Sequence, residues 1–262
     1  MRCTLAVALI LAGLWQAPPA ADRPRVFGIA HVSVQTSDLA KARTFYGGVL
    51  GFAEQAPAQS GRAVFVVNAR QRLIVHDGLP PDRDERLLEV AFDVDAVRSA
   101  ETKDPDGHVI RFVAMRGSAD ATASPDRRIS RRILHAGLTI KDPVAADRFY
   151  KDTLGFSEIW RGGRPEGTIS WINMRVPDGT DYLEYMLYPG APPTRQQLGS
   201  AHHVALLVPD IQQALETVRA RTHLDDRNHR ATPNIGVNNR WQLNVFDPDG
   251  TRVEFMEPFT VR

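Results

Sequence analysis

Hydrophobic and polar residues alternate along several short segments of the chain, as expected for strands with one buried face. The last of these segments, residues 251–256, follows an Asp-Pro-Asp-Gly turn. Val253 and Phe255 point to one face of this strand, and Glu254 points to the other. A carboxylate in an apolar strand needs a cation or a hydrogen-bond partner, because burying an isolated charge is costly. We therefore expect other parts of the chain to supply a cation to Glu254.

The same strand-then-helix pattern occurs twice, in residues 29–52 and 133–156, and the residue numbers differ by 104 at every match. Each helix starts at an aspartate suited to the N-cap and ends at a glycine suited to the C-terminus. A second correspondence, between residues 103–112 and 246–255, places an Asp-Pro-Asp-Gly turn before the last strand of each copy. The matched residues of the first correspondence include His31 with His135, Asp38 with Asp142, Tyr46 with Tyr150, and Gly51-Phe52 with Gly155-Phe156.

The repeat predicts two related α+β domains, residues 26–115 and 132–259, joined by a linker at 116–131 that is rich in Ser, Ala, Asp and Arg. The second domain divides further into two β-α-β-β-β units, joined by a loop at 189–200 with Gly and Pro residues. The first unit has strands near 135–140, 157–161, 168–176 and 181–188, and a helix at 144–154. The second has a strand at 203–208, a helix at 211–219, and strands ending in 241–246 and 251–256.

The first residues, 1–21, are predicted to form a secretory signal peptide, with an apolar run from Cys3 to Trp15 and small residues at Ala20 and Ala21. A membrane anchor is the alternative, but a spanning helix needs about 20 apolar residues. We therefore expect a periplasmic or secreted protein without membrane contact after cleavage. Cys3 is the only cysteine, which excludes disulfides and cysteine-bound zinc from the mature chain. A net charge of +1 gives no electrostatic reason to expect a nucleic-acid partner.

Four polar residues occupy matching strands of the two units in the second domain. His135 and His203 lie in the first strands, and Glu184 and Glu254 lie in the last strands. Equivalent positions of two similar units related by a pseudo-two-fold axis converge on one point. Two imidazoles and two carboxylates suit one divalent metal ion, and mixed N and O ligands favour Zn, Ni, Co, Fe or Mn over Ca or Mg.

These segments resemble the vicinal oxygen chelate (VOC) superfamily, which includes glyoxalases, extradiol dioxygenases and bleomycin-resistance proteins. The resemblance covers essentially the whole mature chain. It implies two tandem VOC domains built from βαβββ units that form open, barrel-like sheets, and a metal that chelates two adjacent oxygens of a small-molecule substrate. The order His, Glu, His, Glu is similar to bacterial glyoxalase I, which implies that His135, Glu184, His203 and Glu254 are the ligands. The motifs that carry the resemblance are residues 134–142, 149–156, 183–185, 203–210 and 247–254.

The first domain lacks this ligand set. His31 matches the first ligand, but Ile74 or Val75, Glu89 and Arg111 occupy the other three positions. The distance in sequence from Glu89 to Arg111 is also too short for a full helix and two further strands. We therefore expect a trimmed domain without metal, in which His31 is structural.

A glyoxalase-like lyase or isomerase is the main prediction, and two other functions remain as alternatives. A glyoxalase-like lyase or isomerase would use Glu254 or Glu184, loosened from the metal, as the catalytic general base, and the fourth ligand, Glu184, favours it. A periplasmic location fits glutathione adducts poorly, however. A non-catalytic small-molecule-binding or resistance protein is another possibility, but it would not need four ligands.

An extradiol-type dioxygenase is the third possibility, because that family also combines a degenerate first domain with a metal-bearing second domain. It would use His135, His203 and Glu254. The tyrosine and the additional histidine that the family places before the final ligand correspond here to Asn244 and Ile235, although His229 lies nearby.

The substrate-binding candidates are residues able to stack on a planar ligand or to bind an anionic group. A polar cluster of His223, Asp225, Asp226 and His229 could mimic a metal site, but its loop context favours simple solvation. A homodimer is compatible with the paired units. The substrate-binding candidates are Trp171, Asn173, Asn238, Asn239, Arg240 and Trp241.

Overall fold

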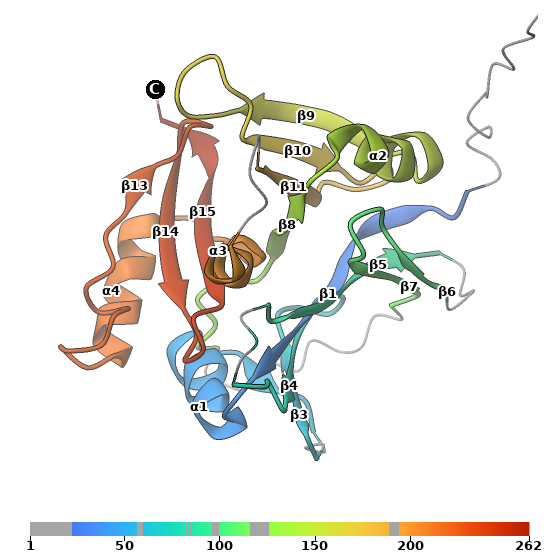
Figure 1. The fold of residues 1–262 in the computed structure, drawn as a ribbon. Helices are drawn as coiled ribbons and strands as arrows, with labels where there is room; N and C mark the ends of the chain where they lie inside the picture. Colours follow the sequence, from blue (N-terminus) through green and yellow to red (C-terminus); the bar gives the residue numbers. More distant parts are fainter. Residues whose placement is uncertain are drawn as a thin grey trace, which may run out of the picture.

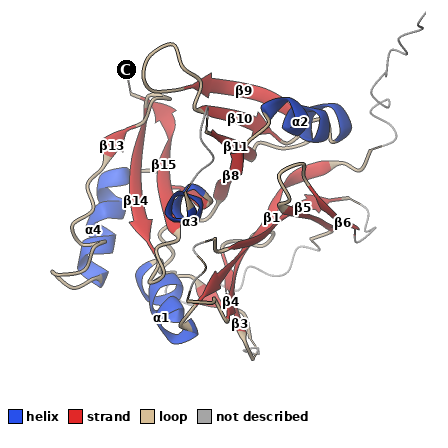
Figure 2. Ribbon diagram, viewed as in Figure 1, coloured by secondary structure: helices blue, strands red, loops and turns tan. Residues whose placement is uncertain are grey.

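The computed structural model describes residues 23–56, 60–81, 83, 85–95, 100–115, 126–188 and 194–261, without the side chains of residues 195–197 (Figures 1 and 2). The predicted signal peptide, residues 1–21, lies outside the described residues, as do residues 116–125 of the predicted linker. Each repeat forms its own mixed sheet, so the chain contains two tandem α+β domains.

The first domain is built on a seven-stranded sheet in the order β2-β3-β4-β1-β5-β7-β6. Its central strand, β1, pairs in parallel with β4 and antiparallel with β5. The elements are β1 (Val26–Thr36), α1 (Leu39–Arg43), a π-helical turn η1 (Thr44–Val49), β2 (Ala53–Glu54), β3 (Arg62–Val66), β4 (Arg72–Asp77), β5 (Leu87–Val94), β6 (Ala100–Lys103) and β7 (Val109–Val113).

The second domain contains an eight-stranded sheet in the order β13-β14-β15-β12-β8-β11-β10-β9. Here β8 takes the place of β1, pairing in parallel with β11 and antiparallel with β12. The elements are β8 (Ile133–Ile140), α2 (Pro143–Asp147), η2 (Arg148–Thr153), β9 (Ser157–Gly162), β10 (Trp171–Arg175), β11 (Tyr182–Leu187), α3 (Arg195–Ala201), β12 (His203–Leu207), α4 (Ile211–Arg221), β13 (Asn234–Ile235), β14 (Arg240–Phe246) and β15 (Arg252–Thr260).

The helices α1, α2 and α4 begin where the sequence predicts them. The side chains of Asp38, Asp142 and Asp210 accept hydrogen bonds from backbone N–H groups at the starts of α1, α2 and α4, which satisfies donors without an intrahelical partner. Gly51 and Gly155 both adopt φ 77°, the left-handed conformation that favours glycine after a helix. None of the helices in the described part of the chain is long and apolar enough to cross a membrane.

The structure bears on two expectations about the elements, the trimmed first domain and the loop at 189–200. In the described residues between β5 and β7 the first domain has only the short strand β6, whereas the second domain has α4, β13 and β14 between β12 and β15. This confirms that the first domain is trimmed. In contrast, α3 lies in the segment predicted to be a loop. Its packing against β8 and β15 stabilises a helix that the local Gly and Pro residues do not favour.

The two domains are joined by a duplicated contact between the repeated tyrosines and the repeated Asp-Pro-Asp-Gly turns. The hydroxyl of Tyr46, in η1, donates to Asp247 Oδ2 at 3.1 Å. The helix α1, which leads into η1, lies next to the ends of β14 and β15 (Figure 1). The hydroxyl of Tyr150, in η2, donates to Asp104 Oδ2 at 2.9 Å. All four side chains are buried, so each domain supplies one phenol and one carboxylate to the interface.

Candidate metal centre

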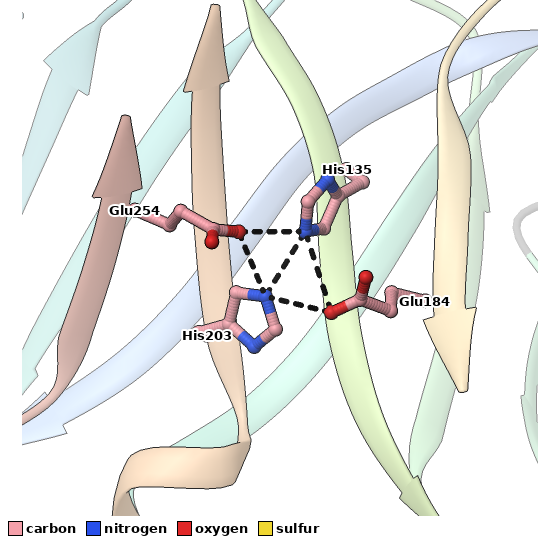
Figure 3. Close-up of side chains that lie close together, drawn as sticks. All are labelled: His135, Glu184, His203 and Glu254. Atoms are coloured by element: carbon pink, nitrogen blue, oxygen red, sulfur yellow. Dashed lines mark hydrogen bonds and ion pairs between the residues drawn. The ribbon is translucent and has the colours of Figure 1, made fainter. Parts of the chain in front are cut away.

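The four predicted ligands lie on four adjacent strands in the middle of the second sheet, β15, β12, β8 and β11. Ala205 lies opposite both His135 and Glu254 in the strand register, and Gly137 lies opposite both His203 and Glu184. The alternation of each strand sends the four side chains to one face. Their side chains point toward a common centre (Figure 3).

The ligand atoms of all four residues lie within 4.8 Å of one another, and all four side chains are buried. His135 Nε2 and His203 Nε2 are 3.0 Å apart. Glu254 Oε2 lies 3.3 Å from His135 Nε2 and 3.6 Å from His203 Nε2. Glu184 Oε2 lies 3.9 Å and 3.5 Å from the same two atoms. The two imidazoles and Glu254 thus form the tightest part of the cluster.

This donor set fits a divalent transition metal ion. At metal–ligand distances of about 2.1 Å, neighbouring donors lie about 3.0–3.4 Å apart, close to the separations found here. His203 Nδ1 lies 2.7 Å from the carbonyl oxygen of Ala201. If Nδ1 donates its proton there, Nε2 keeps a free lone pair that points at the centre, the arrangement common for metal-bound histidine. These residues would hold the ion through two nitrogens and one or two carboxylates.

Gly137 makes room for the His203 ring. A Cβ atom at this position would lie 2.0 Å from His203 Cε1. Shifting the backbone by a few tenths of an ångström would not remove this clash. The first domain has Ser33 at the matching position and Glu89 in place of the histidine. The small residue in β8 is therefore part of the construction of the site.

The surroundings of the cluster shift the pKa values of its two carboxylates in opposite directions. Burial raises the pKa of Glu184, although the charge of His135 opposes this effect. Burial also acts to raise the pKa of Glu254, but hydrogen bonds from His135 and His203 outweigh it and hold that pKa well below its usual range. Burial lowers the pKa of His203 to about 4, so this imidazole is neutral at pH 7 and can bind a metal ion.

A cavity of about 210 Å³ opens beside Glu184 and Glu254. Trp171, predicted from the sequence to bind substrate, lines it, as does Asn238. Trp160, Gln242 and Arg252 were not among the candidates. Strand alternation could have identified Arg252 as a cavity residue, because it lies two residues before Glu254 and therefore on the same face of the strand. The remaining lining residues are Arg164, Asn234, Ile235, Gly236, Val237 and Asn244.

The other predicted substrate residues are distributed around this cavity. Asn173 is buried in β10 opposite Glu184, and its Oδ1 has no hydrogen-bond partner among the described residues. Asn239 lines an adjoining open cavity. Trp241 packs against the hydrophobic core, because alternation turns it away from Gln242. Neither Trp241 nor Arg240 lines the cavity, so their role in substrate binding stays a prediction.

The predicted alternatives in the polar loop before β13 lie apart from the cluster. His229 Nδ1 lies 3.2 Å from the carbonyl oxygen of Arg219 in α4, and His229 does not line the cavity. In the described residues, His223, Asp225 and Asp226 form no ligand cluster with it.

In the first domain an internal ion cluster occupies the corresponding position. Register places Ile74, Glu89 and Arg111 where the second domain has Glu184, His203 and Glu254. Glu89 Oε1 lies 2.7 Å from His31 Nε2, and Glu89 Oε2 accepts from Arg111 Nε at 2.9 Å. A guanidinium therefore compensates the carboxylate where the second domain would use a metal ion.

Comparison with models of protein families identifies the superfamily of the chain. A family model described as the Glyoxalase/Bleomycin resistance protein/Dioxygenase superfamily matches residues 28–100 and 132–255. The chain belongs to this superfamily. The first matched segment covers β1 to β5 of the first sheet, and the second runs from β8 into β15 of the second sheet, so the tandem domains are two VOC domains. No curated protein sequence matches the chain significantly.

Solved structures with the same fold include extradiol dioxygenases. The 2,3-dioxygenase LapB from Pseudomonas sp. KL28 is 16% identical with a TM-score of 0.66, and the match covers 89% of this chain and 92% of that one. Homoprotocatechuate 2,3-dioxygenase from Brevibacterium fuscum, in an anaerobic complex with 3,4-dihydroxyphenylacetate, is 20% identical with a TM-score of 0.65, covering 92% of this chain and 83% of that one.

These matches concern the overall fold. The sequence suggested bacterial glyoxalase I as the most similar metal site, and the structural neighbours named above are dioxygenases. Similarity of the whole fold reflects the arrangement of two tandem domains in one chain. The order of four ligands is a local property that such a comparison does not weigh.

Proposed function

We propose that the protein is a mononuclear metal-dependent enzyme that cleaves the ring of a small catechol-like substrate, as an extradiol-type dioxygenase. The observation that carries the proposal is the convergence of His135, His203 and Glu254 in the second of two tandem domains. Two histidines and one carboxylate are the ligand set of many non-haem iron oxygenases. The extradiol names of the structural neighbours support the same reaction class.

His135, His203 and Glu254 would hold a divalent ion such as Fe or Mn. When bound, this ion supplies Lewis-acid stabilisation to two adjacent substrate oxygens and the redox chemistry of oxygen. Trp160 and Trp171 line the cavity and can stack on an aromatic ring.

Two further side chains can act on the substrate hydroxyls. Asn244 Oδ1, opposite Glu254 in the strand register, is buried without a hydrogen-bond partner among the described residues and can accept a hydrogen bond from a substrate hydroxyl. Glu184, the carboxylate farther from His135, can take up the proton that a catechol loses on binding.

A lyase or isomerase of glyoxalase type is the second candidate, and Glu184 favours it. A second buried carboxylate next to the chelated oxygens could move a proton between neighbouring carbons of the substrate. This candidate is also favoured by two replacements. Asn244 stands where extradiol dioxygenases have a tyrosine, and Ile235 stands where they have an additional histidine.

The two candidates differ in their need for oxygen. Protein lacking residues 1–22 is to be reconstituted anaerobically with Fe(II), Mn(II), Ni(II) or Zn(II), and oxygen uptake is measured with catechol and dihydroxybenzoates. Oxygen uptake with Fe or Mn supports the dioxygenase, and Glu184→Gln should slow this uptake because Glu184 takes up the catechol proton. Hemithioacetal turnover that needs no oxygen, and that Glu184→Gln abolishes, supports the lyase instead. Protein that binds metal but shows neither activity would support a small-molecule-binding role.

We also propose export of the protein through its first 21 residues. Mass spectrometry of the chain purified from a bacterial periplasm tests this: cleavage near Ala20 or Ala21 is expected. An intact N-terminus in the cytoplasmic fraction would contradict it.

A further inference from the structure

The guanidinium of Arg252 directly contacts a residue of the candidate metal centre. Its Nη2 lies 2.6 Å from His203 Nδ1, across the same imidazole ring from the Nε2 that faces the other ligands. It lies on β15, two residues before Glu254, and lines the same cavity. A group bound at the metal centre would therefore lie close to this guanidinium.

Arg252 forms no salt bridge with a carboxylate in the described part of the chain, although its charge acts to lower the pKa of both Glu184 and Glu254. Its Nε is buried without a hydrogen-bond acceptor, and its Nη2 contacts His203 Nδ1. That nitrogen can accept from Arg252 only if it carries no proton. A metal-binding His203 needs the opposite tautomer, in which Nδ1 donates to Ala201. Metal binding would therefore remove the acceptor of Arg252.

The charges around the cavity point to the group that replaces this acceptor. Its charged lining residues are Glu184, Glu254, Arg164 and Arg252, which sum to zero. A divalent ion would leave a net charge of about +2 in a site whose ligands are buried. A half-buried guanidinium without a partner is expected to bind a carboxylate, which matches the planar donor geometry of arginine.

We infer that Arg252 is a specificity-determining residue that binds a carboxylate next to the chelating oxygens, so that the substrate is an anionic aromatic diol such as a dihydroxybenzoate. This inference rests on the proposed function, because the oxygens must first be chelated. The carboxylate has to be adjacent to the diol, since Arg252 lies only one imidazole ring away from the metal-facing nitrogen of His203.

The test compares two ligands with the same chelating diol, 2,3-dihydroxybenzoate and catechol. Their dissociation constants for zinc-loaded protein are measured by anaerobic calorimetry, since zinc does not oxidise the diol. We expect 2,3-dihydroxybenzoate to bind at least about ten-fold more tightly than catechol. Arg252→Met should remove this preference, and Arg252→Lys should retain part of it. The control, Arg175→Met, changes an exposed arginine on β10 and should keep the full preference.

Four outcomes would overturn the inference. Equal binding of both ligands to the wild-type protein, or an undiminished preference in Arg252→Met, would do so while leaving the proposed function intact. Binding of neither ligand would reject the proposed chelation together with the inference. Zinc content is measured for each variant. A loss of zinc in both Arg252→Met and Arg252→Lys, but not in Arg175→Met, would show that Arg252 positions the ligands instead.

Discussion

Glu184 and Glu254 belong to one cluster but are not equivalent. Glu254 Oε2 is closer to His135 Nε2, at 3.3 Å against 3.9 Å for Glu184, and its pKa is held low where that of Glu184 is raised. We expect Glu254→Gln to weaken zinc binding by more than about 100-fold, and Glu184→Gln by about ten-fold or less. Competition with a chromophoric chelator measures both constants.

The matched control for these variants is Glu216→Gln, which changes an exposed carboxylate on α4 and should leave zinc affinity unchanged. Equal losses in Glu184→Gln and Glu254→Gln would mean that both carboxylates are ligands of similar strength. That result would favour the four-ligand site implied by the glyoxalase resemblance.

Glu89 in the first domain gives a prediction about pH. The hydrogen bond from His31, assisted by Arg111, lowers the pKa of Glu89 to about 2 against burial, compared with 4.5 for an unperturbed glutamate. Between these values the unfolded state binds more protons than the folded state, so this contribution to stability is present above pH 4.5 and is lost as the pH falls toward 2. The urea midpoint of the wild-type protein should drop between about pH 5 and pH 3.

Glu89→Gln cannot titrate and should show a smaller drop over this range. Glu101→Gln is the matched control, because Glu101 binds the same Arg111 but is half exposed, and it should keep nearly the wild-type drop. If all three proteins respond equally to pH, other carboxylates determine the acid sensitivity.

At the residue level, the sequence predicts the buried His/Glu cluster better than the lining of the cavity. The meeting of these four residues follows from the repeat, because equivalent strand positions determine where side chains meet. The contacts of Arg252 and the room that Gly137 provides depend on packing between strands that are distant in sequence. The trimmed first domain was also predictable, since the sequence length between Glu89 and Arg111 limits what can fit.

At the scale of elements, the π-helical turns η1 and η2 connect the domains through Tyr46 and Tyr150. Each phenol donates to a buried aspartate, and a hydrogen bond to a charged group contributes about 1.5–3 kcal/mol. Tyr46→Phe and Tyr150→Phe should each lower the free energy of unfolding by about 1–2 kcal/mol, measured by urea denaturation. Burial raises the pKa of Asp247 to about 6, so the effect of Tyr46→Phe should be the smaller one below pH 6.

The control is Tyr185→Phe in β11. Its hydroxyl is buried without a hydrogen-bond partner in the described structure, so its removal should be neutral or slightly stabilising. A loss for Tyr185→Phe as large as that for the other two variants would attribute the effects to packing instead of to the interdomain hydrogen bonds.

The element that the sequence did not predict, α3, illustrates the limit of local patterns. Residues 189–200 read as a loop, yet α3 packs on β8 and β15, and the strand that follows it begins with His203. Ala201, at the end of α3, supplies the carbonyl that contacts His203 Nδ1. A helix stabilised by such tertiary contacts has no signal in the nearby sequence.

At the scale of the whole molecule, the reciprocal tyrosine–aspartate contacts predict that the domains unfold together. Trp160, Trp171 and Trp241 all lie in the second domain, so in a chain lacking residues 1–22 tryptophan fluorescence reports that domain alone, whereas circular dichroism reports both. The two urea transitions should coincide.

Zinc at about 100 times its dissociation constant should raise both midpoints together, by an amount equivalent to about 2.7 kcal/mol. The double variant Tyr46→Phe, Tyr150→Phe should separate them, because zinc would then stabilise the second domain alone. Two separate transitions in the wild-type protein would show that the interface is too weak to couple the domains.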